Sequence, residues 1–438
     1  PFLENTAEFF NPQKGGADEK ANALRRAIIN TTDNLEIQGK EYYISYRGSD
    51  DNSGDSKEKA WKTVVGYINH INQLRPGDAV LFERGGVYRG SFPLVSGVSY
   101  GAFGTGPKPH IYGSPNNFAD ESLWDDTGTE NLWVCTEPLL YDIGVIIFNH
   151  GKAVGLKRLE GRASLKSNYQ FYHDLPSGRV YLYLDEGNPG ALFDDIELCP
   201  RQHVLIGGRA TDITIDNLCI KYGGAHGINF CDTKDVRITN CEVGWIGGSL
   251  QHERVRFGNG IEFWNSCENV LIENCWVYQC YDAGITHQGD PGSIHSKVIF
   301  RGNLIEYCTY AIELFLIKSQ GHMKDILYEE NILRFSGYGW GTQRPDPDAE
   351  SLLNGWGYYH PAENFIIQNN IFDLSTRNLI YMHHKGTFNI RFKGNTYYQK
   401  GNQVAKWNDG NLNAYSQIEL EEQIEKIEAS PNHIKFIE

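Results

Sequence analysis

Several common signals are missing from this 438-residue chain. No apolar run reaches the length of about 18 residues that a membrane-spanning helix needs, so no such span is expected. Basic residues are not in excess, because Asp and Glu outnumber Lys and Arg by 55 to 40 and give a formal net charge of −15. A nucleic-acid-binding protein would carry a basic stripe, so nucleic acid is not an expected partner. The acidic balance also disfavours unaided binding of a polyanion, unless a metal bridges the charges.

The usual metal and disulfide patterns are also missing. The sequence has no CxxC and no HExxH motif, and its nine cysteines are an odd number. Cys241 and Cys275 occupy apolar repeat positions, so we interpret them as small buried hydrophobic residues rather than disulfide partners or metal ligands. The chain starts at Pro1 without Met or a signal peptide, which suggests a processed or trimmed protein that is secreted, periplasmic or on the cell surface.

A short phrase recurs between residues 224 and 315. Its four copies are His226-Gly-Ile-Asn-Phe, Asn259-Gly-Ile-Glu-Phe, Ala283-Gly-Ile-Thr-His and Tyr310-Ala-Ile-Glu-Leu. Apolar alternations that end in Asn follow the copies, and these Asn residues are 217, 240, 274, 303, 331, 370 and 395. The steps between them vary from 23 to 39 residues, which is typical of short strands whose turns carry insertions. The sequence therefore predicts an all-β fold, a right-handed single-stranded parallel β-helix in which each coil packs on its neighbours.

The repeat also predicts which side chains face inward. One inward column comprises Ile228, Ile261, Ile285 and Ile312, and a second comprises Leu218, Cys241, Cys275, Leu304, Ile332 and Ile371. Strand alternation sends the flanking residues outward. On one side stand Gly227, Gly260, Gly284 and Ala311, and on the other stand Asn229, Glu262, Thr286 and Glu313. We interpret these two sets as the bare floor and the polar wall of a groove.

The rest of the chain is predicted to cap or decorate this solenoid. Expected units are an N-terminal arm (1–40), an N-terminal cap with the first coils (41–113), an inserted small β subdomain (114–197), the β-helix core with the groove (198–401) and a C-terminal cap with a helix (402–438). Capping helices would cover the open ends of the solenoid. Residues 337–350 form a long insertion that is expected to wall the site.

Motifs in the first third of the chain resemble a known family. They are Tyr43-Ile-Ser-x-x-Gly48-Ser-Asp50-x-Asn52-x-Gly54, Trp61-Lys-Thr63, Pro76-Gly-Asp-x-Val-Leu-Phe82 with Gly90, and Tyr100-Gly followed by Gly104-Thr-Gly-Pro. Together with the Asn-marked coils, they resemble bacterial carbohydrate-active proteins of the pectate-lyase-like β-helix superfamily. That resemblance covers most of the chain. It implies an enzyme acting on a saccharide, since the superfamily contains glycoside hydrolases, polyuronate lyases and epimerases.

Three carboxylates are the candidate catalytic residues. Glu262 and Glu313 share the outward column two coils apart, which places their backbones roughly 9.6 Å from each other. This separation overlaps the roughly 6.5–9.5 Å between the carboxyl groups of inverting glycosidases. Asp282 precedes the phrase Ala283-Gly-Ile and could form a closer pair with either Glu, which would suit retention. The sequence leaves both outcomes open.

Seven other residues are candidate substrate-binding groups, because they lie in or beside the repeat phrase, in a turn, or at the matching place in a later coil, and offer polar tips or flat rings. They are His226, Asn229, Trp264, His287, Trp340, His383 and Lys385.

The leading hypothesis is a glycoside hydrolase acting on a plant or host glycan, with no cofactor and no metal site. The first alternative is a Ca²⁺-dependent polysaccharide lyase or uronate epimerase, in which the same carboxylates hold Ca²⁺ and a Lys or Arg abstracts the proton. The second alternative is a β-helix that binds glycan without catalysis. An oligo- or polysaccharide is the expected partner in each case, and the sequence does not indicate an oligomeric state.

Overall fold

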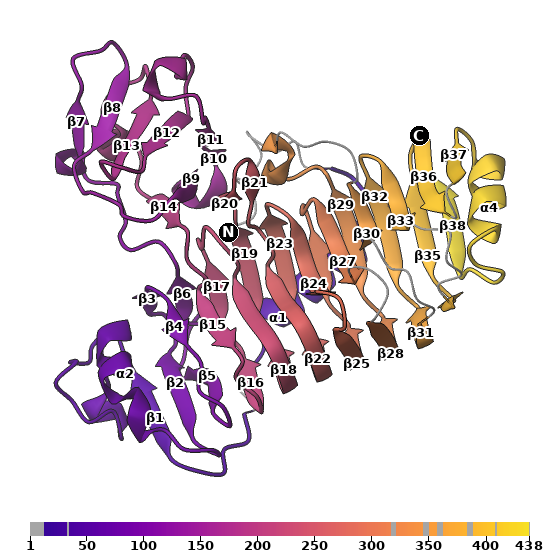
Figure 1. Ribbon diagram of the computed structural model, residues 1–438, viewed down its shortest axis with the longest axis horizontal. Coiled ribbons are helices and arrows are strands. Elements are labelled where there is room, and N and C mark those ends of the chain that lie inside the picture. The colour runs from indigo at the N-terminus through magenta and orange to yellow at the C-terminus, as the bar shows by residue number, and fades with distance from the viewer. Residues whose placement is uncertain are drawn as a thin grey trace.

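The computed structural model describes residues 13–32, 35–316, 321–344, 350–356, 362–382, 389–407 and 410–437. Its main body is a parallel β-helix, with strands stacked side by side along the long axis of the molecule (Figure 1). Each regular coil contributes one strand to each of three faces, and the prediction of a parallel β-helix is confirmed.

The first face, called the site face below, carries the repeat phrase. Its strands are β4 (Phe92–Pro93), β15 (Leu205–Gly208), the first half of β18 (Ile228–Thr239), the first half of β22 (Ile261–Glu273), β24 (Ala283–Gly289), β27 (Tyr310–Leu316), β30 (Ser351–Trp356), β33 (Asn378–Met382) and β36 (Asn402–Trp407), with β37 (Gly410–Ala414) antiparallel at its end.

The second face contains β1 (Glu41–Ile44), β2 (Ala79–Glu83), β5 (Ser99–Phe103), β16 (Ile213–Asp216), the second halves of β18 and β22, β25 (Ile294–Arg301), β28 (His322–Glu329), β31 (Glu363–Gln368) and β34 (Ile390–Lys393). The third face contains β3 (Val87–Arg89), β6 (His110–Tyr112), β17 (Cys219–Lys221), β19 (Glu242–Ile246), β23 (Trp276–Cys280), β26 (Leu304–Glu306), β29 (Ile332–Ser336), β32 (Ile371–Ser375), β35 (Thr396–Gln399) and β38 (His433–Phe436).

The core follows the predicted isoleucine column. Ile228 pairs with Ile261, Ile261 with Ile285 and Ile285 with Ile312, and all four are fully buried. The second predicted column is correct only in its first half. Leu218, Cys241 and Cys275 lie in this core, whereas Leu304, Ile332 and Ile371 face outward on the third face, under helix α1 (Asp18–Ile29). The nine cysteines are all free thiols.

The two halves of this column differ because the recurring Asn residues occupy two different, adjacent positions of the turn. Asn217, Asn240 and Asn274 have positive φ angles of 64°, 54° and 51°, a conformation that Asn tolerates at a turn. Asn303, Asn331, Asn370 and Asn395 stand one position later and point inward instead. There the amide oxygen of each accepts the backbone N–H from the previous coil, as from Asn331 to Asn370 at 3.0 Å. These four residues are called the asparagine ladder below.

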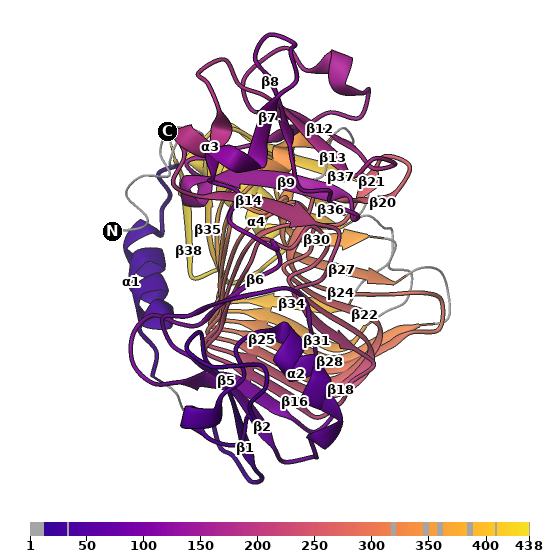
Figure 2. The ribbon, with the colours of Figure 1, turned by 90° about the vertical axis from the view of Figure 1, so that its left-hand side faces the viewer.

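Helices cover the ends and one side of the solenoid. Helix α2 (Val64–His70) covers the first coil, where Tyr67 packs on Phe92 with ring centroids 5.8 Å apart. Helix α4 (Gln417–Glu425) buries Leu420 and Ile424 at the other end. Helix α1 runs along the outside of the third face (Figure 2). Among the described residues, no helix is long and apolar enough to cross a membrane.

The predicted insert forms its own small sheets beside the N-terminal coils (Figure 1). Its elements are β7 (Trp124–Asp126), β8 (Leu132–Cys135), β9 (Ile143–Phe148), β10 (Ala153–Val154), β11 (Leu156–Lys157), β12 (Gln170–Asp174), β13 (Arg179–Tyr183), α3 (Pro189–Leu192) and β14 (Ile196–Pro200). The hairpin of β20 (Leu250–His252) and β21 (Val255–Arg256) joins it to the solenoid, because the Leu250 backbone N–H donates to the Asp142 carboxylate at 2.6 Å. Short 3₁₀ helices are η1 (Lys57–Lys59), η2 (Ile71–Gln73), η3 (Glu121–Leu123), η4 (Asn149–Gly151), η5 (Arg162–Ser164) and η6 (Trp340–Gln343).

Candidate active site

An outward column of polar residues crosses the site face. In register order it contains Asn229, Glu262, Thr286, Glu313, Asn354, Tyr381 and Lys406. Glu262 and Glu313 therefore share one column two coils apart, as the repeat predicted. Both are nearly covered, with exposed fractions of 6% and 5%. A carboxylate that is buried to this degree requires hydrogen-bond donors or a proton.

Glu262 is surrounded by N–H donors. The backbone N–H of Asn259 donates to His226 Nδ1 at 3.1 Å, so the ring proton lies on Nε2, which is 2.7 Å from Glu262 Oε2. Asn229 Nδ2 donates to the same oxygen at 3.0 Å, and Asn259 Nδ2 approaches Oε1 at 3.4 Å. Burial acts to raise the pKa of Glu262, but His226 and Asn229 outweigh it and hold the pKa below its usual value. Glu262 is therefore an ionised, acceptor-only carboxylate.

The pKa of Glu313 is shifted in the opposite direction. Burial and the neighbouring charge of Asp282 raise the pKa of Glu313 well above its usual value, and Arg344 only partly opposes them. Gln288 Nε2 donates to Glu313 Oε2 at 2.6 Å and Asn354 Nδ2 donates to Oε1 at 3.2 Å. A raised pKa favours the protonated form of this carboxyl group, which is the form that can act as an acid.

Asp282 lies at the edge of the column, before β24. Its carboxylate is 2.8 Å from Arg344 Nη1, and the Arg344 guanidinium lies over the rings of Tyr281 and Tyr310. Arg344 follows η6 in the predicted wall 337–350. Trp340 anchors that wall, because its indole N–H donates to the Gln279 carbonyl at 2.7 Å.

Thr286 and Asn354 carry unsatisfied atoms beside the two glutamates. Thr286 lies in the coil between Glu262 and Glu313, and Asn354 lies one coil beyond Glu313. Thr286 Oγ1 and Asn354 Oδ1 are buried and make no hydrogen bond among the described residues. Buried polar atoms are usually paired, so such exceptions indicate a ligand, a water or a moving group.

The predicted groove floor is wrong. A Cβ atom on Gly227, Gly260 or Gly284 would meet Val243, Val277 or Ile305 inside the solenoid, within 2.8 Å in each case. These glycines precede the Ile at a corner of the coil, so the strict alternation of a strand does not yet apply to them. They allow the third face to pack closely.

The structure brings four of the ten predicted site residues around one carboxyl network, namely His226, Asn229, Glu262 and Glu313. Asp282 lies at its edge, and Trp264 is half-buried on the same face. His287 faces inward with no exposed surface, and Trp340 is 1% exposed, so neither presents a ring face to a ligand. His383 and Lys385 lie outside the described residues.

Several residues of this site were not predicted as members. Gln288, Phe315 and Asn354 could have been found only from strand alternation. Gln288 and Phe315 lie two residues after Thr286 and Glu313, and Asn354 lies one coil beyond Glu313. His203 stacks on His226 with centroids 5.0 Å apart. Arg344 comes from an insertion without periodicity, and no sequence signal placed it.

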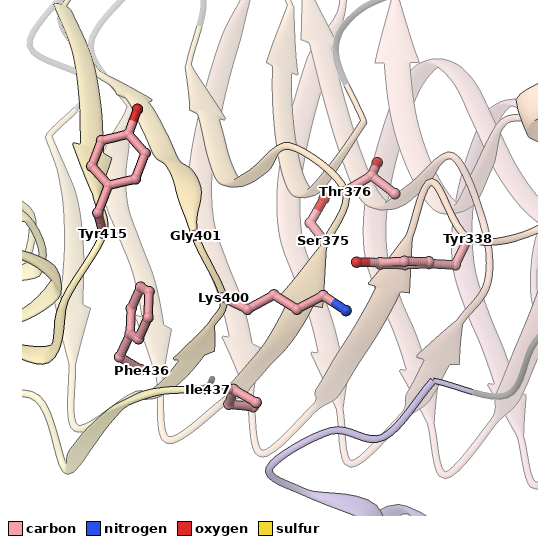
Figure 3. Close-up of a pocket in the computed structure, with 8 residues that line it drawn as sticks. All are labelled: Tyr338, Ser375, Thr376, Lys400, Gly401, Tyr415, Phe436 and Ile437. Atoms are coloured by element: carbon pink, nitrogen blue, oxygen red, sulfur yellow. The ribbon is translucent and has the colours of Figure 1, made fainter.

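Another depression lies near the C-terminal end of the solenoid (Figure 3). It is lined by Tyr338, Ser375, Thr376, Lys400, Gly401, Tyr415, Phe436 and Ile437. Lys400 is the single charged side chain among them and none is a carboxylate. This depression has no pair of groups for acid and base chemistry, so the carboxylate column is the candidate active site.

Comparisons with known proteins identify the fold. The sequence matches no protein-family model and no curated protein. Among solved structures, a glycoside hydrolase matches 91% of this chain and 96% of its own length, with 10% identity and a TM-score of 0.50. A lacto-N-biosidase from Eubacterium ramulus matches 96% of this chain and 70% of its own, with 14% identity and a TM-score of 0.43. A rhamnogalacturonan lyase matches 82% and 74%, with 12% identity and a TM-score of 0.45. At these identities the likeness concerns the parallel β-helix fold, and the reaction has to be argued from the site.

Proposed function

We propose that this protein is a glycoside hydrolase in which Glu313 is the general acid and Glu262 is the general base. The observation that carries the proposal is that two carboxyl groups of one column have pKa values shifted in opposite directions, raised for Glu313 and lowered for Glu262. Environments that keep one carboxyl group protonated and its neighbour ionised are how a glycosidase divides the two roles. The hydrolases among the solved structures of this fold agree with the proposal without deciding it.

The two residues act in one displacement. Glu313 transfers its proton to the glycosidic oxygen as the bond from that oxygen to the anomeric carbon breaks. A water molecule attacks the same carbon from the opposite side and gives its proton to Glu262. Two coils separate the residues, roughly 9.6 Å between backbones, which leaves room for that water. Inversion of the anomeric configuration is therefore expected.

Asp282 has a supporting role in this proposal. It is paired with Arg344 rather than placed in the column, and its charge helps to raise the pKa of Glu313. This makes it a positioning residue, whereas the sequence suggested a third catalytic carboxylate.

The donor set fits hydrolysis better than a Ca²⁺-dependent lyase. Calcium takes about six to eight oxygen ligands, mainly from ionised carboxylates and carbonyls. The oxygens of Glu262 accept N–H groups and Glu313 holds a proton, so neither offers a free anionic oxygen. Arg344, a possible base, is already ion-paired with Asp282.

Chromogenic aryl glycosides, including xylosides, fucosides and galacturonides, test the proposal. Release of the phenol and of reducing sugar is expected with and without a chelator. Glu313→Gln and Glu262→Gln should each lower kcat by at least about 100-fold while the circular dichroism spectrum stays unchanged. Glu268→Gln is the matched control, because Glu268 is an exposed residue of β22. Full activity in both site variants would refute the proposal. A chelator-sensitive product with ultraviolet absorption would establish the lyase, and glycan retention on a native gel without turnover would establish a binding protein.

A further inference from the structure

A second outward row lies two residues beyond the carboxylate column. In register order its residues are Trp264, Gln288, Phe315 and Trp356, called the aromatic rail below. All four are half-buried, whereas Glu262, Thr286, Glu313 and Asn354 of the column are nearly covered. The rail is therefore the accessible edge of the site.

Two rings of the rail stack on no other ring of the described residues. Many large rings of the solenoid are paired, as where Trp276 stacks on Tyr278 with centroids 4.1 Å apart. Trp264 and Phe315 form no ring pair among the described residues, and the Trp264 indole N–H makes no hydrogen bond there. Trp356 packs against Tyr381 at 5.3 Å, which fixes its orientation. Unpaired, partly exposed rings are surfaces on which the apolar face of a sugar can stack.

The rings lie on both sides of the reaction centre. Trp264 shares a strand with Glu262, and Phe315 shares a strand with Glu313. Trp356 stands one coil farther on, about 4.8 Å along the axis. In the other direction the row continues to Cys231, which offers no ring. The stacked rings of His203 and His226, crossed by Phe257 at 5.2 Å, occupy that end of the column.

We propose that the substrate is a saccharide chain bound along the solenoid axis, with one sugar on Trp264 and at least two on Phe315 and Trp356. This inference rests on the proposed hydrolase function. Glu313, on the Phe315 side, protonates the oxygen that joins the two parts. The chain over Phe315 and Trp356 leaves with that proton as a new hydroxyl group, and the sugar on Trp264 receives the hydroxyl of the water.

The rail predicts a dependence on chain length. For the wild type, kcat/KM should rise about 3- to 10-fold with each added unit that reaches a ring, from aryl glycoside to disaccharide to trisaccharide, and then level off. The probes are aryl glycosides and the xylo-, gluco- and galacto-oligosaccharides of two to five units. Phe315→Ala should lose more kcat/KM on the trisaccharide than on the aryl glycoside. Trp264→Ala should lower kcat/KM on every substrate. Tyr415→Ala is the matched control, because Tyr415 is 67% exposed and follows β37, which pairs with β36 three coils beyond Glu313. The kinetics of this control should equal those of the wild type.

A binding measurement gives an independent readout. Calorimetry on Glu313→Gln with the same oligosaccharides should show affinity that increases up to three units, and Phe315→Ala in that background should remove the increase. Equal rates and affinities for short and long substrates would refute the proposal that the aromatic rail binds a saccharide chain, but would not refute the proposed hydrolase function. If the wild type cleaves none of these glycosides and Glu313→Gln binds none of the oligosaccharides, both proposals are refuted.

Discussion

Replacing Asn331 by Ala should destabilise the solenoid severely, because Asn331 is a central member of the asparagine ladder. Its Oδ1 accepts the backbone N–H and the side-chain N–H of Asn303, at 3.0 and 2.9 Å. Its Nδ2 donates to the Phe300 carbonyl at 2.8 Å and to Asn370 Oδ1 at 2.9 Å. Ala removes four hydrogen bonds at a position with no exposed surface. At about 1 kcal/mol for each bond, and more where a buried group is left unpaired, the free energy of unfolding should fall by about 4 kcal/mol or more.

Urea and thermal unfolding followed by circular dichroism measure this loss. Glu363→Ala is the matched control, because Glu363 also bonds across coils, to Lys324 Nζ at 3.1 Å, but on the second face with 67% of its side chain exposed. The control should lose less than about 1 kcal/mol, since water replaces an exposed hydrogen bond. A similar small loss in both variants would refute the argument that the inward asparagines hold the coils together.

Three further predictions concern the site and the core. Asp282→Asn should shift the alkaline limb of the kcat/KM profile to lower pH, because the charge of Asp282 raises the pKa of Glu313. Arg344→Ala should shift that limb to higher pH, because the charge of Arg344 lowers the same pKa. An alkaline limb that does not move in either variant would contradict the assignment of Glu313. Burial lowers the pKa of His295 to about 4. Its contribution to stability is therefore present above the unfolded pKa of about 6.5 and is lost as the pH falls through 4. Urea titrations should show this as a loss of about 3 kcal/mol that is absent from a stably folded His295→Gln variant. Thr286→Val should leave the unfolding temperature unchanged or raised, because it removes a buried hydroxyl that bonds none of the described residues. The same variant should lower kcat/KM by about 10-fold. A destabilised variant would show that the hydroxyl is paired within the fold.

The register of the catalytic column could be predicted because a repeated phrase aligns strands without knowledge of their connections. Ile261 and Ile312 had to stack inward if the phrase was one strand of a coil, and alternation then placed Glu262 and Glu313 on one outward line. The same rule already implied that His287, next to the outward Thr286, points inward. It fills the core there, where its Nδ1 lies 2.7 Å from His295 Nδ1.

Corners and insertions were not predictable in the same way. Alternation fails at the corner before each Ile, which is why Gly227 and its equivalents face the interior instead of forming a floor. Arg344 reaches Asp282 from a long insertion, and its position depends on how Trp340 is buried against the third face. Aperiodic contacts of this kind leave no pattern in a single sequence. Burial and the charge of Asp282 raise the pKa of Glu313 against the opposing charge of Arg344, so this shift could not be inferred either.

The two polar columns of this solenoid differ in a way that separates structure from function. Along the asparagine ladder both atoms of the Asn331 amide are hydrogen-bonded, which is what a polar column needs when its task is to hold coils together. Along the site column, Thr286 Oγ1 and Asn354 Oδ1 are buried and form no hydrogen bond with any described residue, directly beside one glutamate whose pKa is raised and one whose pKa is lowered. A purely structural column has no reason to retain such atoms, because apolar side chains of the same shape would be more stable there. The unpaired atoms are therefore best explained by a polar ligand that completes their hydrogen bonds during the reaction.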